Sequence, residues 1–139
     1  LIEALSDTEQ SVSRFAALTL GQIGSSAAPA VPALAHLLAS GNLDVRNSAA
    51  YALAQIGEPS ISALTGALQG VSTAARIPAA NALREIGRAA APAVPALIVA
   101  LNDPDADVRR AVARALERMN TPESQDALQT FYTRTVGGA

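Results

Sequence analysis

Few side chains in this sequence are of a type that performs catalysis. The chain has one histidine, His36, and no cysteine, and each of its ten basic residues is an arginine. It therefore lacks a thiolate nucleophile, a cysteine metal site and the lysine that Schiff-base chemistry needs. A single histidine on an exposed helix position is typical of a surface residue. We therefore predict no catalytic residue, no cofactor and no metal ion.

One short run of aspartates has a spacing that suits calcium. Asp103, Asp105 and Asp107 occupy alternate positions, as the first ligands of an EF-hand loop do. That loop also needs glycine at its sixth position and glutamate at its twelfth, which here are Val108 and Arg114. Aspartates at the start of a helix cap its free N–H groups and stabilise its dipole. We therefore assign these residues to helix capping.

The elements that position these residues are internal repeats. Four segments share an initial Val or Ala, a run rich in alanine and a final Gly or Asn. They are segments 12–24, 45–57, 75–87 and 108–120. Leu1 and Leu34 are 33 residues apart, and so are Leu64 and Leu97. A fixed period predicts a stack of like units rather than one globular core. The joint after Gly57 is three residues shorter than those after Gly24 and Gly87, a change that a loop tolerates.

Each unit reads as two helices. In the second unit, Val45, Ala49 and Leu53 recur at the spacing of one helical face, which predicts the first helix. Asn42 precedes this helix at the position of an N-cap, and Asp105 holds the same place in the fourth unit.

A glycine and a proline-rich turn separate the two helices of a unit. Gly24, Gly57 and Gly87 mark the end of the first helix, where a left-handed glycine is favoured. The sequence A-A-P-A-V-P-A-L follows at 27–34 and again at 90–97, and its prolines fit a turn and the first turn of a helix. We expect the second helix to run about ten residues, a usual helix length.

Pro78 interrupts this pattern within the first helix of the third unit, where Ser48 and Ala111 occupy the matching positions. Proline in a helix interior removes a hydrogen bond and clashes with the preceding turn. We predict a kink at Pro78 or a helix that begins late, near Ile77.

With these motifs the chain resembles HEAT repeats, and in particular the PBS-lyase HEAT-like subgroup, whose repeats read D-x-x-V-R-x-x-A-A-x-A-L-G-x-I-G and then A-x-P-A-L-x-x-L-L. The resemblance implies an all-α fold, a right-handed α-α superhelix (solenoid) of about four helical hairpins that begins with a half repeat. It places first helices on the convex side and second helices on the concave side. It also implies structural Asp and Arg side chains at the joints, interrupted at Ser13. The joint positions are Asp44, Arg46, Asp107 and Arg109.

We expect one solenoid domain, residues 1–133, followed by a frayed tail, residues 134–139. Its units are a half repeat, 1–7, and the repeats 8–40, 41–70, 71–103 and 104–133. The segment 1–5 would be a second helix without its first helix, so we expect a longer solenoid or a partner that covers this end. At the other end, Phe131 and Tyr132 are predicted to face inward.

Composition limits the possible functions. Hydrophobic residues make up 50% of the chain but aromatic residues only 3%, which indicates a core of aliphatic side chains. The net charge of −2 argues against a general nucleic-acid role, which needs a basic surface. The sequence has no targeting segment and no run long enough to span a membrane, so we expect a cytoplasmic protein.

Two surfaces remain as candidate sites. The first, which we call the second-helix strip, follows the outward positions of the second helices and is mostly neutral with apolar points, as protein contacts often are. Its residues are His36, Thr65, Gln69, Ile98, Val99 and Asn102. The second, the arginine patch, would suit an acidic partner. Its residues are Arg84, Arg88, Arg110, Arg114 and Arg118.

Three functions fit these observations. The first is a non-enzymatic scaffold that binds another protein along the concave surface. The second follows only from the resemblance, which implies a bilin lyase or phycobiliprotein chaperone subunit with a phycobiliprotein as its partner. The third is a structural spacer of a larger complex, in contact with neighbouring repeats of a longer chain.

Overall fold

The computed structural model describes residues 1–137, and this part of the chain is built from helices without a strand. The α-helices are α1 (Gln10–Ile23), α2 (Val31–Leu37), α3 (Leu43–Ile56), α4 (Ile61–Gln69), α5 (Thr73–Ile86), α6 (Val94–Ala100), α7 (Ala106–Met119) and α8 (Pro122–Gly137). Short 3-10 helices join or precede them: η1 (Glu3–Ser6), η2 (Gly24–Ala30), η3 (Glu58–Ser60) and η4 (Gly87–Ala93).

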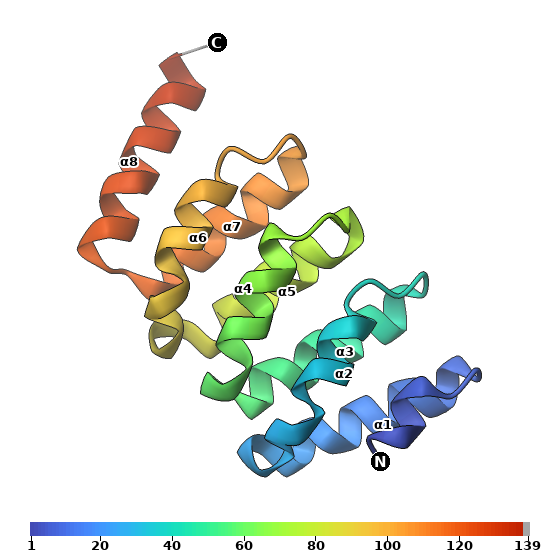
Figure 1. Ribbon diagram of the computed structural model, residues 1–139. Helices are drawn as coiled ribbons and strands as arrows, with labels where there is room; N and C mark the ends of the chain where they lie inside the picture. Colours follow the sequence, from blue (N-terminus) through green and yellow to red (C-terminus); the bar gives the residue numbers. More distant parts are fainter. Residues whose placement is uncertain (138–139) are drawn as a thin grey trace.

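The helices form two layers that advance together along one axis (Figure 1). The first helices α1, α3, α5 and α7 contact one another in sequence, and so do the second helices α2, α4, α6 and α8. Each second helix also packs on the next first helix. The predicted all-α solenoid of helical hairpins is confirmed.

The core runs through all units because equivalent positions are buried in each. Leu53, Leu83 and Leu116 on the first helices, and Leu34 and Leu97 on the second helices, have no exposed surface. Alanines between them are also buried, and their small side chains let neighbouring helices approach closely. Each unit therefore removes its apolar face from water only by packing on the next.

The glycines that end the first helices adopt a conformation that we did not predict. Gly24, Gly57 and Gly87 have φ of 78°, 83° and 75°, but ψ of −143°, −133° and −137°. They therefore lie outside the left-handed helical region, in a region open almost only to glycine. The reason is that the chain turns directly into a 3-10 helix. Asn120, which ends α7, does take the left-handed conformation.

The 3-10 segments also shorten the second helices. α2 and α6 each span 7 residues and α4 spans 9, rather than about ten, because the proline-containing turn winds as a 3-10 helix. η3 spans 3 residues where η2 and η4 span 7. The deletion in the second unit thus falls within the turn.

The first helix of the third unit does not begin late, near Ile77, so that part of the prediction for Pro78 is wrong. α5 is continuous from Thr73 to Ile86 and contains Pro78, which is buried. The helix tolerates proline here because the carbonyl that loses its donor belongs to Ala74, in the first turn, and Ala74 is exposed and open to water.

The two ends of the chain match the predictions only in part. At the N-terminal end Leu5 is buried and Leu1 is exposed. At the other end Phe131 is half-buried against the core, but Tyr132 is 43% exposed and was wrongly predicted to face inward. α8 continues to Gly137, so residues 134–137 are helical rather than frayed. Residues 138–139 of the predicted tail lie outside the described residues.

Candidate partner-binding surface

The joints between units fix where each second helix ends. At each joint, the second residue of the repeat motif donates a hydrogen bond to the carbonyl oxygen six residues earlier. The pairs are Ser13–Asp7 at 2.9 Å, Arg46–Ser40 at 2.5 Å, Arg76–Gly70 at 3.1 Å and Arg109–Asp103 at 2.7 Å. These bonds satisfy carbonyls that a helix end or turn leaves free, and Ser13 takes the place of arginine in the first unit.

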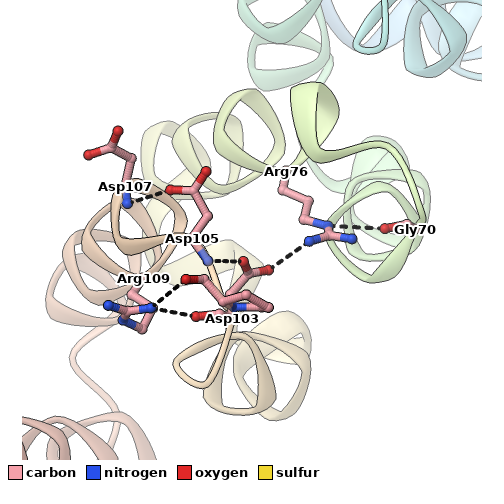
Figure 2. A network of polar contacts seen from close by, with 7 residues as sticks. Gly70, Arg76, Asp103, Asp105, Asp107 and Arg109 are labelled. Carbon is pink, nitrogen blue, oxygen red and sulfur yellow. Dashed lines mark hydrogen bonds and ion pairs between the residues drawn. The ribbon is translucent and has the colours of Figure 1, made fainter.

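One joint also carries a partly buried ion pair, which links the start of the third unit to its end. Arg76 Nη1 lies 3.1 Å from Asp103 Oδ2, and their side chains are 20% and 8% exposed (Figure 2). Asp103 also accepts the N–H of Asp105 at 2.9 Å, and Asp105 accepts the N–H of Asp107 at 2.7 Å. Asp105 caps α7 as predicted, and Asn42 caps α3 by accepting the N–H of Val45 at 3.1 Å.

Two predicted structural aspartates do not act at the joints. Asp44 and Asp107 have exposed side chains, and they form surface ion pairs with Arg14 at 3.8 Å and Arg110 at 3.1 Å. The reason is that they lie in the first turn of a helix and point to solvent. The joints depend instead on arginines and on backbone carbonyls.

The second helices frame three shallow depressions, each between neighbouring units. The first, of about 480 Å³, lies between η1 and α2 and includes His36. The second, of about 750 Å³, lies between α4 and η4 and includes Thr65 and Gln69. The third, of about 510 Å³, lies between α4 and α6 and includes Gln69, Val99 and Asn102. The second and third depressions therefore meet at Gln69.

The structure brings most of the second-helix strip to this surface. His36, Gln69 and Asn102 are exposed, and Val99 is 66% exposed. Thr65 is half-buried and donates its hydroxyl hydrogen to the Ile61 carbonyl at 2.8 Å. These residues combine an apolar contact with amide groups that donate and accept hydrogen bonds, which is the chemistry of a protein contact.

Ile98 differs from the rest of the strip. Its side chain is half-buried and packs against the core, so it supports the surface from below rather than contributing exposed area. Sequence reasoning missed polar residues that line the depressions from the turns, such as Glu58 and Asp7. No periodic signal marks them, because they lie in the 3-10 segments and joints.

The arginine patch lies on the opposite layer, on α5, η4 and α7, and all five of its side chains are exposed. Beside it, Tyr132 donates a hydrogen bond to Glu117. This bond, followed by partial burial, raises the pKa of Tyr132 from 10.0 to about 12. The phenol therefore stays protonated at neutral pH and cannot serve as a base there.

Across residues 1–137, no three His, Cys, Asp or Glu side chains gather into a group able to hold a metal ion. Within the same residues, no helix is long and apolar enough to cross a membrane.

The repeats match a known family. A model of HEAT repeats matches residues 1–84 and, in a second overlapping match, residues 61–137. This chain belongs to the HEAT-repeat family. The resemblance predicted from the repeat motifs is therefore confirmed.

The HEAT-repeat chain is similar to a protein of Pseudanabaena tenuis (strain PCC 7409) named uncharacterized phycocyanin operon protein Z. The two are 42% identical over an alignment of 108 positions, and the match covers 70% of this chain and 51% of that protein. The chain thus spans about half the length of this relative.

Solved structures share the fold. The complex of CpcE and CpcF of phycocyanin lyase from Nostoc sp. PCC7120 is similar with a TM-score of 0.60 and 23% identity, over 98% of this chain and 64% of that one. A designed armadillo repeat protein in complex with the peptide (KR)4 is similar with a TM-score of 0.57 and 18% identity, over 96% and 70%. At this identity the likeness concerns the fold.

Proposed function

We propose that this HEAT-repeat chain is a non-enzymatic scaffold that binds another protein along the second-helix strip. The observation that supports this most is that Gln69 lines two neighbouring depressions, which continue across α4 and α6. A surface that continues over consecutive repeats suits an extended contact with a protein better than a small-molecule site, which is usually one concave pocket.

A phycobiliprotein is the partner that we propose. The support comes from the relative named after a phycocyanin operon, which is 42% identical over 70% of this chain. The strip is compatible with such a partner because its exposed residues are neutral or apolar, and Val99 offers exposed apolar surface that a protein contact would bury.

The second candidate function is that of a bilin lyase or phycobiliprotein chaperone subunit. The fold shared with the CpcE–CpcF complex of phycocyanin lyase supports it. A pull-down with phycobiliprotein subunits and free bilin, followed by absorbance, separates the two candidates. A scaffold retains the subunits without covalent bilin, whereas a lyase yields subunits whose bilin absorbance persists after denaturation.

Substitution of Val99 tests the strip directly. We expect Val99→Glu to weaken the binding of phycobiliprotein subunits about tenfold or more, because it places a charge in an apolar contact. The control is Val71→Glu, because Val71 is 98% exposed in the loop between α4 and α5 and lies outside the strip. Equal affinities for both variants and the native chain would exclude the strip as the site. Absence of any binding by the native chain would favour the spacer function.

A further inference from the structure

The first-helix layer carries a second surface that the proposed function does not use. On this layer the arginine patch combines Arg84 of α5 and Arg88 of η4 with three arginines of α7. Only Arg110 of this patch forms an ion pair among the described residues, with Asp107 at 3.1 Å. The other four guanidinium groups have no carboxylate partner within residues 1–137.

The packing of α5 against α7 brings these groups together. Arg84 and Arg88 lie four residues apart at the end of α5 and in η4, and Arg114 and Arg118 lie four residues apart on α7. All four side chains are exposed.

Arg118 of α7 reaches across to the end of α5. Arg118 Nε lies 3.7 Å from the position that a Cβ atom on Gly87 would take. Gly87 ends α5, and Arg88 follows it directly. Arg84, Arg88, Arg114 and Arg118 thus line both sides of the α5–α7 boundary.

Few carboxylates lie near this cluster. Asp107 pairs with Arg110, Glu117 accepts the hydroxyl hydrogen of Tyr132, and Glu85 is exposed next to Arg84. The four arginines outnumber Glu85 and Glu117, and like charges on adjacent helices repel one another, so a bound anion would relieve this repulsion. In a chain with a net charge of −2, this local excess of positive charge gives the layer one anion-attracting region.

We propose that these four arginines bind a carboxylate-rich segment of a partner protein. A guanidinium group matches a carboxylate with two parallel hydrogen bonds, and four of them along one boundary suit a row of acidic side chains. The site lies on the layer opposite the second-helix strip, so it is independent of the function proposed above.

An oligo-glutamate peptide with a fluorescent label tests this proposal by anisotropy at low salt. We expect the double variant Arg84→Gln/Arg118→Gln to bind about tenfold more weakly than the native chain, because two charged hydrogen-bond donors are lost. The matched control is Arg14→Gln/Arg134→Gln, which removes the same charge from two exposed arginines outside the patch and whose affinity should stay within about twofold of native.

Two results would overturn the proposal. One is equal binding by the double variant and the native chain, and the other is an equal loss in Arg14→Gln/Arg134→Gln, which would indicate net charge alone. Tighter binding of a duplex DNA than of the peptide would also contradict an acidic protein partner.

Thermal unfolding of the same double variant distinguishes a loss of binding from a loss of folding stability. Because the substitutions relieve repulsion between like charges, we expect Tm at low salt to stay equal or rise while binding falls, as at sites where function opposes stability. A clear fall in Tm would show that the arginines stabilise the fold and would count against the proposal.

Discussion

Arg76 and Asp103, at the start and the end of the third unit, form a 3.1 Å ion pair that is largely shielded from water (Figure 2). The same arginine donates from Nε to the Gly70 carbonyl at 3.1 Å. One side chain therefore holds the end of α4, the start of α5 and the loop before α7. This arrangement couples two repeats through polar contacts in addition to their shared core.

Removal of this arginine should destabilise the chain measurably. We expect Arg76→Ala to lower the free energy of unfolding by about 2 kcal/mol, because it leaves the carboxylate of Asp103 buried without its partner. The control, Arg14→Ala, breaks a surface pair of 3.8 Å and should cost less than about 1 kcal/mol. Urea denaturation measures both values, and similar values for the two variants would contradict a structural role for the Arg76–Asp103 pair.

Two glycines allow backbone strain to be separated from steric clash. A Cβ atom at Gly57 or Gly66 would meet no atom within 4 Å, but Gly57 has a φ of +83° and Gly66 lies within α4. We expect Gly57→Ala to destabilise the chain by about 1–3 kcal/mol through strain. Gly66→Ala should stabilise it by about 1 kcal/mol through helix propensity. Thermal unfolding measures both changes, and a neutral Gly57→Ala would mean that the turn can adjust.

Pro78 offers a test of how α5 accommodates proline. The helix is continuous through this buried residue, so an alanine there can donate the missing hydrogen bond without a change of fold. We expect Pro78→Ala to raise the free energy of unfolding by about 1 kcal/mol, the net contribution of one hydrogen bond. The entropy that proline removes from the unfolded chain reduces this gain. A destabilised variant would show instead that packing of the ring outweighs the lost hydrogen bond.

The pH dependence of stability should contain a contribution from Tyr132. Its pKa is raised from 10.0 to about 12 by its hydrogen bond to Glu117, so the folded chain holds this proton more tightly than the unfolded chain. The contribution is fully present below pH 10.0 and is lost as the pH rises toward about 12. Urea denaturation across this range should show a steeper loss of stability in the native chain than in Tyr132→Phe. Parallel curves would contradict the assignment.

Local periodicity and capping rules predict most of the fold. The spacing of Val45, Ala49 and Leu53 predicted α3. Asn42 and Asp105 were predicted correctly as the N-caps of α3 and α7. These features depend on residues close in sequence, so a single chain reveals them. The 33-residue period then implied that neighbouring units share one core.

Features that depend on the folded chain were harder to predict. The ψ angles of the turn glycines depend on the 3-10 segment that follows them, and the ion pair of Arg76 depends on a residue at the far end of its unit, 27 positions away. Exposure of Ile98 was overestimated because its side chain packs against the core. The sequence therefore located the second-helix strip but did not distinguish its contact residues from those that support it.

A photo-crosslinking experiment tests the proposed function most directly. A photoreactive amino acid is placed at position 99, in the second-helix strip, or at position 51, an exposed site on the first-helix layer, and each chain is irradiated with phycobiliprotein subunits. We predict that position 99 cross-links to the partner and position 51 does not. Cross-links from position 51 with none from position 99 would contradict binding through the second helices.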